Sequence, residues 1–142
     1  MSAPRGRVTV AAAATCAAAL SLCACGGTPS PDLFVVDRSG TVPGAKLTLL
    51  VSDTSVRCNG GETHPLSSAA TIDARVLSED LLRLQDSKVA LPALTRAQIF
   101  RYSVRTQTGT LRYPDTAQRP SVLPRLTRFV RRAAIDLCDL KR

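Results

Sequence analysis

The residues of this chain that could do chemistry are few. They are one histidine, His64, and five cysteines: Cys16, Cys23, Cys25, Cys58 and Cys138. With a single histidine and no pair of cysteines in CxxC spacing, the sequence offers no recognisable metal site. No phosphate-binding glycine loop opens a helix, so we expect neither a metal nor another cofactor.

A catalytic site is equally hard to assemble. A Cys–His or Ser–His pair would need His64, which lies in a Gly-Gly-Glu-Thr-His-Pro segment without a nucleophile elbow. Carboxylates are present, but nothing in the pattern places two of them across a cleft. We therefore expect a protein that is not an enzyme, and a small hydrolase is the least favoured alternative.

The first 25 residues are similar to a bacterial lipoprotein signal. Arg5 and Arg7 precede an apolar run from Val8 to Leu22, and Leu22, Ala24 and Cys25 fit the positions that a lipobox requires. The resemblance implies a signal peptide over 1–24, removed in the mature protein, and diacylation of Cys25. It also implies attachment to the extracytoplasmic face of the cytoplasmic membrane.

Two other interpretations of this segment are a plain secretory signal and a transmembrane helix. The stretch from Val8 to Cys25 has 18 residues, eight of them alanine, which is at the lower limit for spanning a membrane. Gly-Gly-Thr-Pro-Ser-Pro follows at once, as a flexible tether would. We therefore expect residues 25–32 to be the lipidated cysteine with its tether, and 33–142 to be a single small α+β domain.

The expected export also bears on the oxidation state of the remaining cysteines. Once Cys25 carries lipid, Cys58 and Cys138 remain as an even pair in an oxidising compartment, 80 positions apart. We expect them to form a disulfide.

The mature chain is strongly basic. Seventeen basic and eleven acidic residues remain after cleavage, a formal net charge of +6. Nucleic acid is not an expected partner outside the cytoplasm, whereas anionic headgroups or an acidic wall polymer are. The simpler interpretation is charge that only keeps the protein soluble, and the sequence names no protein partner.

Hydrophobic periodicity indicates the fold. Period-two or short apolar runs predict strands at 33–37, 46–52, 56–58 and 100–105, with a return strand that ends at Pro114. Val42-Pro43-Gly44 predicts a turn with glycine at positive φ. Helical periodicity predicts a helix over 65–84, capped by Ser67 or Ser68, and a last helix opening at Pro120 and Ser121. The order β-β-β-α-β-β-α predicts an antiparallel sheet of about five strands with two helices packed on one face.

The second hairpin carries a row of arginines. With a two-residue turn at Thr108-Gly109, Arg105 would face Arg112 across the strands, with Arg101 two residues along. Like charges in that position repel, and a bound anion would relieve the repulsion. Arg101, Arg105 and Arg112 are thus the candidate anion-binding residues. The basic face of the last helix is the competing site, and it consists of Arg125, Arg128, Arg131 and Arg132.

Two family resemblances add to this. The stretches 33–40, 42–51 and 56–61, continuing to Leu66-Ser-Ser and Cys138, resemble a family of small, functionally uncharacterised actinobacterial lipoproteins. That resemblance implies a fold and a location but no activity.

A weaker likeness, over 56–65 and the helix after it, is to the Streptomyces subtilisin-inhibitor type. That family pairs the strand cysteine with one in the following helix, where this chain has Ala69 and Ala70, and its second disulfide is absent. The preferred expectation is a non-catalytic, membrane-anchored binding domain, with a protease inhibitor as the alternative.

Overall fold

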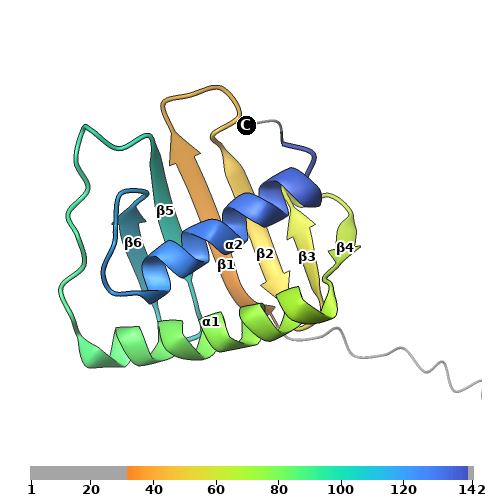
Figure 1. The fold of residues 1–142 in the computed structure, drawn as a ribbon, viewed down its shortest axis with the longest axis horizontal. Helices are drawn as coiled ribbons and strands as arrows, with labels where there is room; N and C mark the ends of the chain where they lie inside the picture. Colours follow the sequence, from red (N-terminus) through yellow and green to blue (C-terminus); the bar gives the residue numbers. More distant parts are fainter. Residues whose placement is uncertain (1–31, 141–142) are drawn as a thin grey trace, which may run out of the picture.

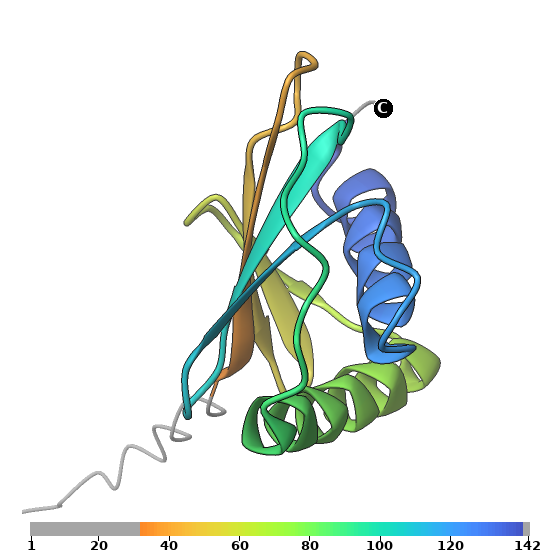
Figure 2. The ribbon, with the colours of Figure 1, turned by 90° about the vertical axis from the view of Figure 1, so that its left-hand side faces the viewer.

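The computed structural model describes residues 32–140, which form one antiparallel sheet with two helices. The strands and helices follow in this order: β1 (Asp32–Gly40), β2 (Leu47–Ser52), β3 (Ser55–Cys58), β4 (Thr63–Pro65), α1 (Ser68–Ser87), β5 (Phe100–Arg105), β6 (Thr110–Pro114) and α2 (Val122–Asp136). Both helices lie on the same side of the sheet, and the opposite face is left uncovered by these elements (Figures 1 and 2). The predicted α+β class, with two helices on one face, is confirmed.

The six strands have the spatial order β4-β3-β2-β1-β5-β6. The first strand of the domain is therefore central, and it pairs with β2 along one edge and β5 along the other. The turn between β1 and β2 has Gly44 at φ 76°, as the Pro-Gly sequence predicts. The strands β1 to β4 form a meander of consecutive neighbours. On the other side of β1, its neighbour is β5, which follows α1 in the sequence.

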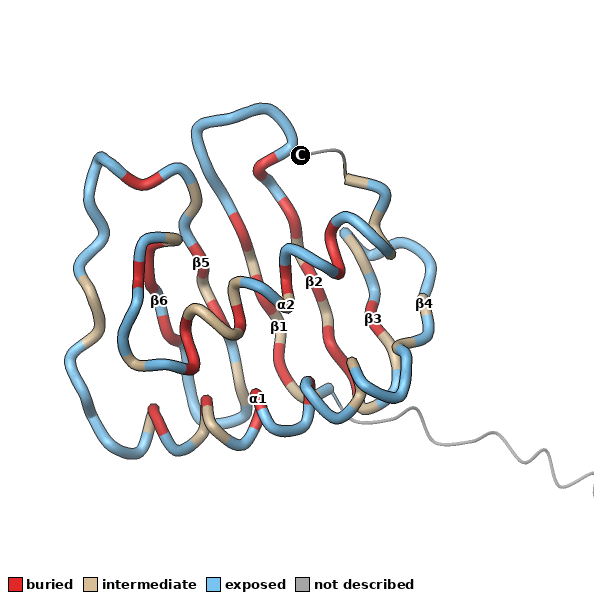
Figure 3. The backbone as a smooth tube through the Cα atoms, in the orientation of Figure 1, coloured by how far each residue is buried: buried red, intermediate tan, exposed pale blue. Residues whose placement is uncertain are grey.

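The core lies between the sheet and the helices. Strand residues alternate between buried and more exposed, as Figure 3 shows along β1 and β2. The inward side chains pack against a narrow stripe of buried residues on α1 and a broader one on α2. The largest fully buried ones include Phe34, Leu49, Leu81, Tyr113, Leu123 and Leu126. Tyr102 and Tyr113 stack with ring centroids 5.1 Å apart on the inward face of β5 and β6.

Local signals fix where α1 begins. The Ser67 hydroxyl accepts a hydrogen bond from the Ala70 amide at 3.2 Å, which confirms Ser67 as the cap. Pro65, where the periodicity predicts the helix to begin, ends strand β4 instead. The helix starts at Ser68 because this hydroxyl satisfies an amide that has no partner within the helix.

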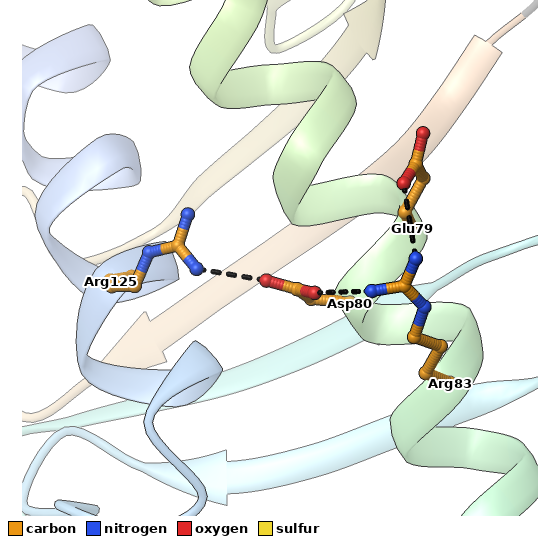
Figure 4. A network of polar contacts seen from close by, with 4 residues as sticks. All are labelled: Glu79, Asp80, Arg83 and Arg125. Carbon is orange, nitrogen blue, oxygen red and sulfur yellow. Dashed lines mark hydrogen bonds and ion pairs between the residues drawn. The ribbon is translucent and has the colours of Figure 1, made fainter.

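Polar contacts tie α1 to α2. Arg125 of α2 donates to Asp80 of α1 at 2.8 Å, and Asp80 also contacts Arg83 one turn further along its own helix (Figure 4). Arg83 reaches Glu79 as well, at 3.4 Å. Of these contacts, Arg125–Asp80 is the one that joins the two helices.

The predicted sheet of about five strands is close to the observed one, which has six because Thr63–Pro65 pairs with β3 as a short edge strand. The predicted register of the second hairpin is wrong. The second hairpin has a four-residue connection, Thr106 to Gly109, closed by a hydrogen bond from the Thr106 amide to the Gly109 carbonyl. The longer connection moves the register, so that Arg105 faces Thr110 and Arg112 faces Ser103. Within residues 32–140 no helix is long and apolar enough to cross a membrane.

Candidate functional site

The uncovered face of the sheet is the surface that best combines exposure with charge. We call it the basic sheet face and define it by four outward-pointing arginines: Arg57, Arg101, Arg105 and Arg112. Each alternates with an inward, buried neighbour such as Val56, Tyr102 or Leu111, so the pleat itself sets their direction. Three arginines of this face are those that the sequence indicates.

The register brings these arginines into rows across the sheet. Arg57 lies beside Leu50, Leu50 beside Val35, and Val35 beside Arg105. In the next row Asp37 is beside Ser103, and Ser103 is beside Arg112. Arg112 is therefore diagonal to both Arg101 and Arg105 instead of directly opposite one of them. The predicted head-on pair of like charges is wrong, because the hairpin connection is two residues longer than expected.

One carboxylate lies among these arginines. Arg105 approaches Asp37 at 3.6 Å, and Asp37 also accepts a hydrogen bond from the Thr48 hydroxyl at 2.8 Å. Arg57 contacts only the Thr63 hydroxyl in the described structure, at 3.4 Å. Over residues 32–140, Arg101 and Arg112 have no carboxylate within ion-pair distance. The face thus has a net positive charge around a half-buried apolar centre of Val35 and Leu50.

The predicted basic face of the last helix is divided between two hollows. Arg125, Arg128 and Arg132 line a groove between the helices, and Arg131 lines a different cleft near the start of β5. Arg125 is paired with Asp80, and Asp73 and Asp136 line the same groove. Because these acids offset the arginines, the helix is a weaker competing anion site than the sheet face.

The groove between α1 and α2 has a volume of about 590 Å³. Its floor is apolar and includes Leu66, Leu77 and Phe129, while its rims carry both signs of charge, with Asp73 and Asp136 besides the arginines. Because acidic and basic side chains both line this groove, it does not favour a ligand of either sign.

Among the described residues, the cysteines and the histidine do not form a reactive site. Cys58 of β3 and Cys138, just beyond α2, form a disulfide, which confirms the predicted pair and removes both thiols from nucleophilic chemistry. His64 lies on the edge strand β4 and pairs through its backbone with Val56. Among the described residues no group of three or more His, Cys, Asp or Glu could hold a metal ion. Cys25, the predicted lipidation site, lies outside the described residues.

Sequence reasoning missed Arg57 as a member of the basic sheet face. The signal was present in the alternation Val56-Arg57-Cys58, where an inward valine and an inward cysteine force the arginine between them outward. What the sequence did not show is that this strand lies in the same row as Arg105.

Comparison of the chain with protein-family models, with curated proteins and with solved structures found no match. The resemblance to small actinobacterial lipoproteins therefore stays a prediction.

Proposed function

We propose that this protein is a lipid-anchored, extracytoplasmic binding domain that uses its basic sheet face to bind an anionic surface, namely the headgroups of the membrane that holds it. The observation that carries the proposal is the set of four arginines on one sheet face, of which only Arg105 has a carboxylate, Asp37, within ion-pair distance in the described structure. Cationic side chains within a Debye length of an anionic membrane are each worth about 1 kcal/mol.

The length of the proposed tether supports membrane headgroups over a more distant wall polymer. Asp32, where β1 begins, is only seven positions after Cys25, and a chain of that length spans at most about 25 Å. Arg105 pairs with Val35, three residues into β1, which puts it about 10 Å from that point along the strand. Arg101 pairs with Ser39 and is about 13 Å farther from the tether.

This geometry leads to a graded expectation. Arg105 and Arg57, which share the row nearest the tether, should contribute more to membrane binding than Arg101. The test uses the chain from residue 25 onward with Cys25→Ser, so that an acyl chain does not mask the electrostatic contribution. Binding is measured by cosedimentation with vesicles of phosphatidylglycerol and phosphatidylcholine, and with phosphatidylcholine vesicles alone.

We expect Arg105→Gln and Arg57→Gln each to weaken binding to the anionic vesicles by about fivefold, and Arg101→Gln to weaken it less. The loss should shrink as salt is raised, because exposed charges are screened. Arg128→Gln on α2 is the matched control, since it removes the same charge from the opposite side of the sheet. If Arg128→Gln weakens binding as much as Arg105→Gln, the binding is not located on the sheet face.

An acidic wall polymer is the alternative anion. A soluble phosphodiester wall polymer, tested with the same variants, distinguishes the two. Polymer binding that depends on Arg101 as strongly as on Arg105, without vesicle binding, would replace the membrane proposal.

The protease-inhibitor alternative would use residues 87–96 as its reactive loop, from the last residue of α1 into the connection to β5. The disulfide of the described structure joins Cys58 to Cys138 and does not brace that segment, so nothing favours the inhibitor role over the basic face. A screen against subtilisin-like proteases tests it directly, and inhibition by the purified protein would revive it.

A further inference from the structure

A cleft at the end of the sheet farther from Asp32 contains charged groups that the proposed function does not use. It lies on the helix side of the sheet, has a volume of about 320 Å³, and is bordered by the turn at Pro43 and Gly44, the start of β5 and the second half of α2. That volume is in the range of small-molecule sites. The charged and hydroxyl-bearing side chains among its lining residues are Arg38, Tyr102, Asp115, Thr127 and Arg131.

Arg38 points inward and is only 8% exposed. Its Nε donates to the Ala45 carbonyl at 2.9 Å and its Nη2 to the Gly44 carbonyl at 3.2 Å, and its guanidinium carbon lies 5.0 Å from the centre of the Phe100 ring. Within residues 32–140 it has no carboxylate partner at ion-pair distance. An arginine keeps its charge when buried, so this burial is unfavourable unless an anion compensates it.

Asp115 lines the same cleft with an unused acceptor. Its Oδ2 accepts a hydrogen bond from the Phe100 amide at 3.1 Å, whereas its Oδ1 is buried and has no partner in the described structure. A buried carboxylate oxygen without a donor is costly. The lining of the cleft therefore includes a carboxylate with an unpaired oxygen as well as an unpaired cation.

Tyr102 lines the same cleft, and the charged groups around it affect its hydroxyl. Burial raises the pKa of Tyr102, the positive charge of Arg38 opposes that rise, and the charges of Asp115 and Arg131 act on the same hydroxyl in opposite directions. Two cations, one anion and a phenol thus share one small space, with Phe100, Ile135 and Leu140 as its apolar lining.

We propose that this cleft binds a small organic acid that carries a hydrogen-bond donor next to its carboxylate, as a free amino acid does. The carboxylate pairs with Arg38 and Arg131, the ammonium pairs with the Asp115 carboxylate, and a short apolar side chain contacts Phe100 and Leu140. A purely structural role for Arg38 in holding the turn at Gly44 and Ala45 explains its two hydrogen bonds. It does not explain why an acid and a second arginine line the same cleft.

The test is a titration of the full-length protein, purified from its own cells, followed by NMR. Three probes of similar shape separate the groups: leucine carries both charges, 4-methylpentanoate only the carboxylate, and isopentylamine only the ammonium. We expect leucine to bind with a Kd of about 1 mM, as suits a ligand of this size. 4-Methylpentanoate should bind about tenfold more weakly, because it cannot donate to Asp115, and isopentylamine should not bind.

Arg131→Gln should weaken leucine binding by about tenfold or more, because it removes a charged hydrogen-bond donor. Arg128→Gln, one turn earlier and outside the cleft, should leave it unchanged. Asp115→Asn keeps an oxygen for the Phe100 amide and should abolish the preference for leucine over 4-methylpentanoate. Arg38 itself is not varied, since its removal would also release the turn.

Three outcomes would overturn the proposal. One is the absence of leucine-dependent shifts at Phe100, Tyr102 and Asp115 at about 10 mM, well above the expected Kd. Another is equal binding of all three probes, which would make the cleft merely apolar. The third is an equal effect of Arg128→Gln and Arg131→Gln. None of these outcomes bears on the basic sheet face, which lies on the other side of the sheet.

Discussion

Cys58, the last residue of β3, is bonded to Cys138, two residues past the end of α2, with Cα atoms 5.7 Å apart. The bridge holds the C-terminal end of the last helix against a strand near the edge of the sheet. It closes a loop that contains β4, α1, β5, β6 and α2. Most of the fold therefore lies inside one covalent ring.

Removal of the disulfide should destabilise the protein severely. A closed loop with a sequence separation of 80 corresponds to about 4 kcal/mol in the chain-entropy model, against a net stability of roughly 5–15 kcal/mol for a native protein. We expect Cys58→Ser with Cys138→Ser to lower the free energy of unfolding, measured in urea, by about that amount. The reduced native protein should match the double variant. An unchanged urea midpoint would contradict a stabilising role.

The predicted lipid anchor can be tested by substituting a single cysteine. Cys25→Ala should abolish metabolic labelling with palmitate and leave the precursor unprocessed, because the acyl chain is expected on that thiol. Cys23→Ala is the matched control: it changes a nearby cysteine of the same segment and should leave labelling intact. Labelling that persists in Cys25→Ala would rule out the assignment.

In the observed hairpin register, Arg105 and Arg112 have different neighbours, whereas the register predicted from the sequence placed them opposite each other. Arg105 has Asp37 at 3.6 Å, with the two side chains 59% and 43% exposed, so Arg105→Gln should cost at most about 1 kcal/mol. Arg112 has arginines on both diagonals and no acidic partner within the described chain, so Arg112→Gln should be neutral or stabilise by a few tenths of a kcal/mol. Urea unfolding of the two variants decides this. A larger loss for Arg112→Gln than for Arg105→Gln would contradict the observed register.

Acid should weaken the link between the sheet and α1. Arg75 of α1 forms two hydrogen bonds with Asp53, in the turn between β2 and β3, one of them at 2.7 Å, and this pairing lowers the pKa of Asp53. A carboxylate with a lowered pKa in the folded state adds stability above its unfolded pKa and loses it as the pH falls through the folded value.

The measurement compares wild type with Asp53→Asn over a range of pH. The stability difference between them should be constant above about pH 5 and should shrink on acidification below about pH 4. Arg75 stays protonated throughout, because Asp53 raises its pKa further. A difference that grows as the pH falls would show that the pair does not act in this way.

Elements with strong local signals were predictable. Ser67 caps α1, Gly44 takes positive φ, and inward Tyr102 and Val104 alternate with outward arginines. The hairpin register was not predictable, because a two-residue turn at Thr108-Gly109 and the observed four-residue connection give the same inward and outward pattern. Alternation fixes which face a side chain occupies but not its exact neighbour across the strands.

The candidate sites show the same limit more strongly. Arg101, Arg105 and Arg112 could be proposed because they lie on one hairpin. The cleft around Arg38 could not, because Asp115 and Arg131 come from other elements and Arg38 occupies an inward position usually held by an apolar residue. From the sequence alone, Arg38 after Val35-Val36-Asp37 suggests the end of a strand. Only the positions of the neighbouring strands show that it lies within β1.

The central position of β1 has a mechanical consequence. A pull transmitted through the residues that precede Asp32 acts along a strand held on both sides, by β2 and by β5. The interstrand hydrogen bonds run across that direction, so the load falls on many of them together in shear instead of opening them one at a time. An edge strand in the same place would be peeled from the sheet. If the segment before Asp32 is the tether that we propose, a pull on it meets the most resistant strand of this sheet instead of a strand at its edge.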